Sequence, residues 1–278
     1  MQQFKLPVLV ILCLVSMNAL AQQTKINVKK GEQYQVEATT KTTSSADVMG
    51  QSMESAADTR AITLLKIVDV EPAEIKMEST LTKMRLTATA MGQNSSYDSE
   101  KQDNEGPLAD AFKSSINKTK TVKLDNKGVV TKEDAPEDDP MAMLGVSGNS
   151  SSNDLFISSL IGIELKVGDS YLSANEINSE KLSSRDSGAY KVTAIGNGVA
   201  SISYAGTQVV TMQMEQMGQS MTNNSTNTIK SELQIDMNTG RVLVKASVTE
   251  TNGTIEVGGM SIPITGKTIA TTTITQLK

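Results

Sequence analysis

The chain of 278 residues contains no histidine, no tryptophan and a single cysteine, Cys13. Without histidine, a Ser-His-Asp triad, a Cys-His pair and general acid or base catalysis by imidazole are excluded. Nearly all structural zinc sites are excluded too, because they are built from cysteine and histidine. No other catalytic motif is present, so we expect a protein that is not an enzyme and that has no cofactor.

The first 21 residues have the composition of a secretory signal peptide. Lys5 precedes an apolar run over residues 6–15, and a small-x-small sequence ends at Ala21, which is the pattern before a signal-peptidase site. We therefore expect cleavage between Ala21 and Gln22 and an exported protein, periplasmic or extracellular, that is soluble after cleavage. The apolar run is about half as long as a membrane-spanning helix, and no later stretch is as apolar, so no transmembrane segment is expected.

The single cysteine and the net negative charge give no indication of a lipid anchor or of a nucleic-acid partner. Cys13 lies inside the apolar run, without the small residue before it and the polar residues after it that a lipid-attached cysteine needs. The chain carries 26 basic and 31 acidic residues, a formal net charge of -5. Nucleic-acid binding requires a basic face, so no nucleic-acid partner is expected. Without disulfide bonds the mature protein must be held together by its hydrophobic core, and it is long enough for one large core or two modest ones.

Apolar residues recur mostly at every second position, which is the pattern of a half-buried β-strand. The clearest run covers residues 73–90, where the alternation holds up to Leu81 and then changes parity at Met84. One extra residue in a strand moves every later side chain to the opposite face, so the change predicts a bulge near Lys83.

Turn chemistry separates these runs. Asp and Asn residues lie within a few positions before Gly128 and Gly240, which predicts a tight turn at each glycine. Asn-Gly pairs at residues 197–198 and 252–253 are further hairpin candidates. The sequence therefore predicts a mainly β fold whose strands are antiparallel in most pairings.

Two segments have helical spacing. The first covers residues 107–118, with a proline at its first position and apolar residues on one face. The second begins near Asp154 and ends by Gly162. Residues 133–152 between them contain prolines, acidic residues and a Gly/Ser/Asn run, which indicates a linker.

The parts of the chain on either side of this linker resemble each other. Residues 31–34 and 168–171 both read Gly-acid-x-Tyr, and residues 91–93 and 217–219 both read Met-Gly-Gln. These matches come in the same order in both parts, which predicts an internal duplication.

We therefore predict a signal peptide at residues 1–21, a first β-rich half at 22–132, the linker at 133–152 and a second β-rich half at 153–278. Each half is expected to be a curved antiparallel sheet, open-barrel or sandwich-like, with one or two short helices in all. The extra length of the first half is interpreted as an insertion around the helix near 107–118.

Methionine is the one residue type with a suggestive distribution. Residues 49–53, Met-Gly-Gln-Ser-Met, recur at residues 217–221. Thioethers suit Cu(I), and the densest group forms a candidate Cu(I) site: Met212, Met214, Met217 and Met221. Methionine also fills irregular apolar surfaces, so the same residues could instead pack in the core or line a cleft for an amphiphile.

Six short motifs occur in an order that resembles a known family. They are Lys29 to Tyr34, Met49 to Met53, Tyr97 to Glu100, Leu124 to Gly128, Lys166 to Ser170 and Asp236 to Gly240. Over nearly all of the chain after residue 21, this set is similar to a family of exported bacterial proteins, many of them lipoproteins, known only as a domain of unknown function. The resemblance implies an envelope location, a β-rich fold and no catalytic residue. The chain departs from it in lacking an acylated cysteine and in having Tyr171 where a tryptophan is expected.

The leading expectation is a non-enzymatic, exported cell-envelope binding or scaffold protein. Its partner would be an envelope component or an apolar ligand that the sequence does not identify, and the sequence leaves the oligomeric state open. The alternatives are a carrier of a lipid or other amphiphile, held in a cleft between sheet and helix, and a methionine-rich Cu(I)-binding protein.

Overall fold

The computed structural model describes residues 23–90, 92–101, 104, 106–113, 115–133, 154–179, 181–216 and 219–278. In this part of the chain a 12-stranded antiparallel sheet is accompanied by one short helix and one 3-10 turn, so the predicted mainly β fold is confirmed. The elements are β1 (Gln33–Val48), β2 (Gln51–Val70), β3 (Glu74–Ala90), β4 (Gln93–Asp98), α1 (Pro107–Lys113), β5 (Thr119–Asp125), β6 (Val130–Glu133), η1 (Ser158–Leu160), β7 (Ser170–Asn178), β8 (Leu182–Gly196), β9 (Val199–Gln216), β10 (Gln219–Asp236), β11 (Val242–Val257) and β12 (Met260–Leu277).

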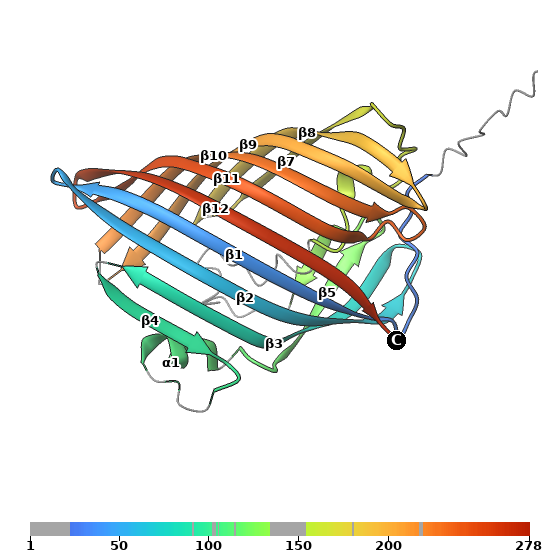
Figure 1. Ribbon diagram of the computed structural model, residues 1–278, viewed down its shortest axis with the longest axis horizontal. Coiled ribbons are helices and arrows are strands. Elements are labelled where there is room, and N and C mark those ends of the chain that lie inside the picture. The colour runs from blue at the N-terminus through green and yellow to red at the C-terminus, as the bar shows by residue number, and fades with distance from the viewer. Residues whose placement is uncertain are drawn as a thin grey trace, which may run out of the picture.

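The sheet is curved and open. Its strand order is β6-β5-β3-β2-β1-β12-β11-β10-β9-β8-β7, with β4 paired to β3. Figure 1 shows β1, β2 and β12 at the front, with β5 and β7 curling round behind them. The two ends of this order, β6 and β7, do not pair with each other, which leaves the curl unclosed.

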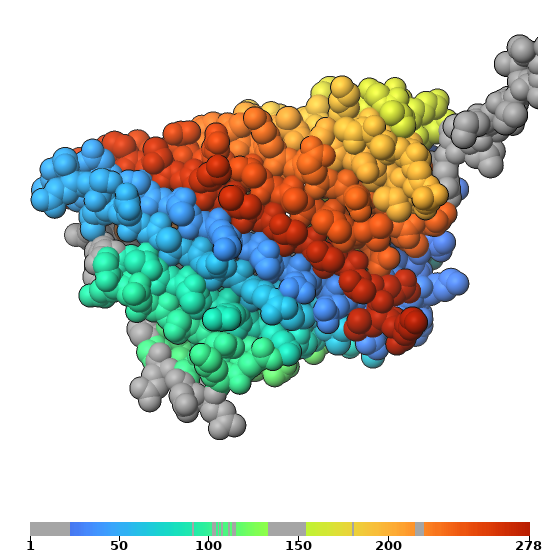
Figure 2. Space-filling model, in the orientation of Figure 1, coloured from blue at the N-terminus to red at the C-terminus, as the bar shows by residue number. Residues whose placement is uncertain are grey.

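The two halves of the chain form one sheet. The first strand, β1, pairs with the last, β12, from Gln33 opposite Leu277 to Ala46 opposite Ile264. The outer face is therefore continuous across this junction, as the space-filling view shows (Figure 2).

The two Gly-acid-x-Tyr sequences begin β1 and β7 with the same backbone geometry. Gly31 has a φ of 90° and donates its N–H to the carbonyl of Ile67, at 2.8 Å. Gly168 has a φ of 93° and donates its N–H to the carbonyl of Val192, at 2.9 Å. A register shift follows both acceptor residues in their strands. The two positions therefore share backbone conformation and hydrogen bonding, while the internal duplication itself stays a prediction.

In the first half, α1 lies in the segment between two short strands, β4 and β5, that both pair with β3. Strand β3 pairs with β5 over residues 74–80 and with β4 over residues 85–90, so β4 and β5 lie end to end along one edge of β3. In the second half a single strand, β10, pairs with β9 along its whole length. The segment that contains α1 therefore lies where the second half has an uninterrupted strand, which is the position expected of an insertion.

Several local predictions are confirmed. In the β2–β3 pairing, Ile62 lies opposite Lys83 and Thr63 opposite Leu81, which leaves Thr82 as the bulged residue. Asn197 and Gly198 have φ values of 52° and 76° and form the two-residue turn between β8 and β9. Positive φ at both central positions is the mark of a hairpin turn that matches the twist of the strands.

The hairpin predicted at residues 252–253 is wrong, because both residues lie inside β11. A Cβ at Gly253 would lie 2.3 Å from the carbonyl oxygen of Asn224 on β10. Glycine occurs here because the neighbouring backbone approaches closely, which is its other role within strands. The turn itself is made by Gly258 and Gly259.

The second predicted helix, near residues 154–162, is also wrong, since only the 3-10 turn Ser158–Leu160 forms there. Leu155, Phe156 and Ile157 are consecutive and all buried. A helix packed on one side cannot bury three successive side chains, whereas an extended segment between two surfaces can. The first predicted helix forms but is shorter than 107–118.

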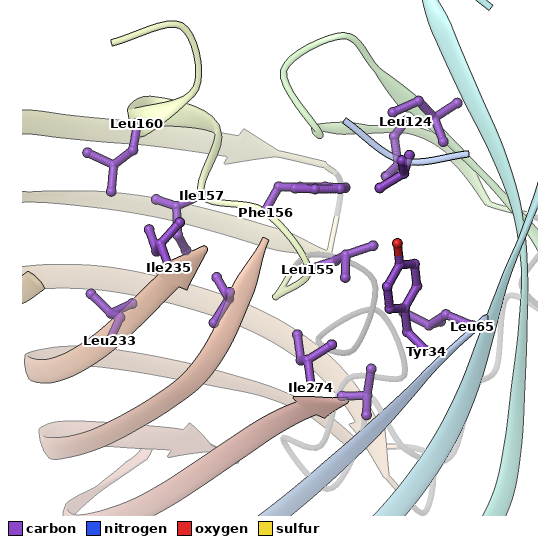
Figure 3. Close-up of a cluster of buried hydrophobic side chains, with 14 of the residues drawn as sticks. Tyr34, Leu65, Leu124, Leu155, Phe156, Ile157, Leu160, Leu233, Ile235 and Ile274 are labelled. Atoms are coloured by element: carbon purple, nitrogen blue, oxygen red, sulfur yellow. The ribbon is translucent and has the colours of Figure 1, made fainter. Parts of the chain in front are cut away.

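The main hydrophobic core lies at the end of the sheet where β1 begins and β12 ends, which we call the base; the opposite end is the tip. Residues 154–165, the base segment, pack here on the face of the sheet that carries Tyr34, which we call the inner face. In Figure 3, Phe156 points toward Leu124 of β5, and Ile157 lies beside Ile235 of β10. One core thus joins strands from both halves.

A short N-terminal stretch holds the base segment in place. Thr24 is fully buried and pairs with Ile163 through its N–H at 3.0 Å, while its carbonyl accepts the N–H of Gly162 at 2.8 Å. Its hydroxyl donates to the carbonyls of Leu160 and Ile163. Every polar group of this buried threonine is therefore satisfied, as stable burial requires.

A second, smaller core lies under α1, nearer the tip. Phe112 packs against Tyr97 with ring centroids 5.5 Å apart, and Met84 and Leu86 of β3 complete the cluster. The helix therefore covers the inner face of the first half, while the inner face of β7–β10 is where the candidate site lies.

Candidate functional site

The inner face changes from apolar to polar between base and tip. Side chains there form hydrogen-bonded ladders across neighbouring strands, which we call the polar belt. Its bonds join Thr42 to Thr268 at 3.1 Å, Ser44 to Ser55 at 2.6 Å, Thr251 to Asn227 at 2.7 Å and Asn227 to Gln208 at 3.0 Å. The sequence did not reveal the belt, because serine and threonine are also common on the outer face.

A cavity of about 720 Å³ lies between the base segment and the inner face of β7–β10. Its polar lining includes Ser173, Asn175, Gln208 and Ser231, its charged lining is Asp154, Glu176, Asp186 and Lys245, and its apolar lining includes Val129, Val130, Phe156, Ile157, Ile177, Tyr190, Tyr204, Ile229 and Leu233. This volume lies in the range of sites for small molecules, roughly 300–1,000 Å³. Apolar walls with a few converging polar groups are also typical of such sites.

Two tyrosines form the aromatic wall of the cavity. Tyr190 of β8 and Tyr204 of β9 are cross-strand partners whose ring centroids lie 4.6 Å apart with an interplanar angle of 39°. Beside them Gly188 faces Gly206, and a Cβ at these positions would lie 2.5 Å and 2.3 Å from the Tyr204 hydroxyl. The hydroxyl end of Tyr204 therefore lies over two glycines, and both tyrosine rings line the cavity.

Asp186 is the cavity carboxylate without a basic partner. It accepts a hydrogen bond from the side-chain amide of Asn175 at 3.0 Å, and no ion pair to it occurs among the described residues. Lys245, by contrast, is neutralised by Asp154 of the base segment, at 2.6 Å. Glu176 pairs with Arg185 at 3.2 Å.

Burial and nearby carboxylates raise the pKa values of both tyrosines in the cavity wall. Burial raises the pKa of Tyr190 well above its ordinary value, and the proximity of Tyr204, Asp186 and Asp154 raises it further. Burial and Asp186 also raise the pKa of Tyr204. Both rings therefore stay neutral at physiological pH.

A buried hydroxyl lies next to Asp186 on the same strand face. Ser184 is two residues before Asp186 on β8 and is 5% exposed, yet its Oγ has no hydrogen-bond partner in the described part of the chain. A buried polar atom without a partner is uncommon in proteins and costs stability. Ser184 is not among the residues that line the cavity.

The structure brings three of the four candidate copper ligands onto one face. Met214 of β9 lies opposite Met221 of β10, and Met212 is two residues from Met214 on the same inner face. Met217 lies outside the described residues. All three are half-buried near the tip, beyond the polar belt, and Leu182 lies opposite Met212. Cu(I) binding stays a prediction, and the apolar neighbours equally fit a packing role.

These methionines are part of a longer apolar band near the tip, the tip band. It crosses β9, β10, β11, β12 and β1 on the inner face, and on β10 it is interrupted by Asn223, which lies between Met212 and Ile255. Its members are Val210, Met212, Met214, Met221, Ile255, Val257, Ile262, Ile264 and Ala46. Each of them is half-buried. From base to tip the inner face therefore reads apolar core, polar belt and cavity, then apolar band.

Two further features are absent from the described residues. They contain no group of three or more Asp or Glu side chains arranged to hold a metal ion. No helix among them is both long and apolar enough to span a membrane. The predicted signal peptide, its cleavage site between Ala21 and Gln22, and nearly all of the predicted linker lie outside them.

The tyrosines give a prediction that needs no ligand. The chain has five tyrosines and no tryptophan, and in all five the folded structure raises the pKa, chiefly by burial. A raised pKa in the folded state contributes stability that is complete below the unfolded value, about pH 10, and that is lost as the pH rises above it. We expect absorbance at 295 nm to show far less tyrosinate at pH 10.5 in native protein than in urea. Equal ionisation in the two would contradict the burial described above.

Comparison with solved structures finds distant likenesses. The chain is 9% identical to OccK7 (OpdD) of Pseudomonas aeruginosa, covering 90% of this chain and 100% of that one, at a TM-score of 0.29. It is 7% identical to OmpF of Salmonella typhi, covering 90% of this chain and 100% of that one, at a TM-score of 0.28. It is 8% identical to DynF of Micromonospora chersina, covering 91% of this chain and 82% of that one, at a TM-score of 0.21. Scores this low support no argument about architecture or function.

No curated protein matches the chain. A protein family does match part of it, over residues 73–134, which run from the start of β3 through α1 to the end of β6. This stretch includes the α1 core and the turn at Gly128 beneath Phe156, and it contributes Val129 and Val130 to the cavity wall. The chain thus contains a region that matches a family of unknown function (DUF6263).

Proposed function

We propose that this protein is a non-enzymatic, exported binding protein of the cell envelope that carries a small amphipathic ligand on the inner face of its sheet. The observation that carries the proposal is the cavity of about 720 Å³ that Tyr204, Asp186 and Gln208 help to line. Export is supported by the signal-peptide pattern of the first 21 residues.

The order of surfaces on the inner face matches the two ends of an amphiphile. The cavity supplies a carboxylate, amides, hydroxyls and an aromatic face for a polar head. Beyond the polar belt, the tip band supplies half-buried aliphatic and thioether side chains for an apolar tail. Methionine adapts its shape to irregular apolar partners, so its concentration in the tip band favours a flexible chain as the occupant.

The charged side chains on the outer face of β1 and β2 favour the inner face as the binding surface. Cross-strand ion pairs lie on the outer face of β1 and β2, where Arg60 pairs with Glu37 at 2.8 Å and Lys41 with Asp58 at 3.1 Å. Charged pairs that are exposed in this way are typical of a solvated surface.

Native mass spectrometry tests the proposal directly. Protein taken from its own cell envelope by mild extraction is expected to carry an added mass of lipid size, and the same spectrum reports copper. The change Tyr204→Leu should remove the added mass, whereas Tyr97→Leu, in the core under α1, should retain it. Wild-type protein that is consistently empty would count against ligand binding, and equal retention by both variants would count against this cavity.

A further inference from the structure

We infer that the polar end of the ligand is a cation, such as an ammonium group, bound between Asp186 and the face of Tyr204. This inference rests on the proposed function and deepens it by naming the chemistry of the head group. It depends on the charges that line the cavity and on the two tyrosine rings in its wall.

The charges of the cavity favour a cation. Of its four charged lining residues, Lys245 and Glu176 are each engaged in an ion pair, Lys245 with Asp154 of the same cavity and Glu176 with Arg185. Asp186 remains, half-buried, with only an amide donor. Because Lys245 is already neutralised, an anionic head would meet uncompensated negative charge, whereas a cation would pair with Asp186.

The aromatic wall adds to the same preference. The face of an aromatic ring attracts a cation, by about 0.5–2 kcal/mol depending on desolvation. The hydroxyl end of Tyr204 lies against Gly188 and Gly206, and its ring lines the cavity beside that of Tyr190. Asp186 acts electrostatically on this same ring. A cation that contacts both groups would therefore be held by a carboxylate and by the negative face of a ring.

The test uses three probes with the same tail and different heads: dodecyltrimethylammonium, dodecanoate and dodecyl maltoside, each below its micelle concentration. Isothermal titration calorimetry measures binding to the protein, and circular dichroism confirms that it stays folded. We expect the cation to bind at least about tenfold more tightly than either of the others, since an ion pair with Asp186 and a cation–π contact with Tyr204 together outweigh the contacts of the other heads by this much. The change Asp186→Asn should abolish that preference and leave maltoside binding unaltered.

The matched control is Asp58→Asn. It removes the same charge from the outer face, where Asp58 pairs with Lys41, so it reports any general attraction of cations to an acidic protein. Equal affinity for the three heads, a preference for dodecanoate, or equal losses in both variants would overturn the cation inference while leaving the proposed function intact. Binding of none of the probes would overturn both.

Discussion

Replacing Gly128 with alanine is expected to lower the free energy of unfolding by about 2–4 kcal/mol, through two separate costs. Gly128 has a φ of 80°, where a side chain costs about 1–2 kcal/mol. The added Cβ would also lie 2.7 Å from the Cβ of Phe156. Phe156 is buried and forms a bridge with Arg241, so it cannot move aside without disturbing the base segment. Urea unfolding followed by circular dichroism measures the effect.

Gly50 provides the matched control. It has a φ of 79° in the β1–β2 turn, and nothing lies within 4 Å of the position of its Cβ. Gly50→Ala should therefore show the backbone cost alone, about 1–2 kcal/mol. The difference between the two losses in free energy of unfolding measures the cost of the steric contact with Phe156. If both variants lose the same stability, the turn at Gly128 does not hold the base segment.

Local patterns in the sequence were sufficient to predict most strands and turns. A parity change near Lys83 identified the bulge, and glycines after Asp or Asn identified the turns at Gly128 and Gly240. These features depend on interactions between residues close in the chain. The pairing of β1 with β12 could not be derived in this way, because an alternating strand has no preference for a particular partner of the same pattern.

Failures of the sequence analysis occurred where a local signal had a distant cause. The Asn-Gly pair at 252–253 has the composition of a turn, but the glycine is needed where Asn224 of another strand comes close. Residues 154–162 have apolar residues that suit a helix, but they are extended because they lie between surfaces from both halves of the chain. Tertiary packing overrides propensity in both cases.

The candidate site was missed for the same reason. Asp186 and Tyr204 belong to no motif, and only the pairing of β8 with β9 brings them together. Two signals were nevertheless available, since Gly188 and Gly206 are isolated glycines within strands, which often mark a close approach. The methionine group was predicted from spacing alone, and strand register does place Met212, Met214 and Met221 on one face.

Because the main core lies at the base, the inner face near the tip is available for ligand binding. The side chains buried in the main core lie near the base, while the inner face toward the tip on β9–β12 is only half-buried. Regions with fewer buried apolar contacts open at lower cost than the core. A ligand could therefore enter over the tip band without unfolding the base.

The second large effect is expected at Gly206, where stability and ligand binding should fall together. A Cβ there would lie 2.3 Å from the Tyr204 hydroxyl and 2.7 Å from the carbonyl oxygen of Ser187. The ring can swing away but the backbone oxygen cannot, so Gly206→Ala should cost about 1–3 kcal/mol by overpacking. Gly196→Ala, at a position with no atom within 4 Å, should change stability by less than about 1 kcal/mol.

The displaced ring makes this variant diagnostic of the site. If Tyr204 is held flat by the two glycines, Gly206→Ala should alter the near-ultraviolet circular dichroism of the Tyr190–Tyr204 pair and weaken dodecyltrimethylammonium binding by about tenfold. Adding Tyr204→Leu should recover part of the stability, because the contact with the hydroxyl disappears while the contact with the Ser187 carbonyl remains. The two changes should therefore be non-additive, as expected for residues in contact. Additive losses, or a Gly206→Ala variant as stable as Gly196→Ala, would show that the ring does not lie over the glycines, and the aromatic wall of the cavity would have to be assigned to Tyr190 alone.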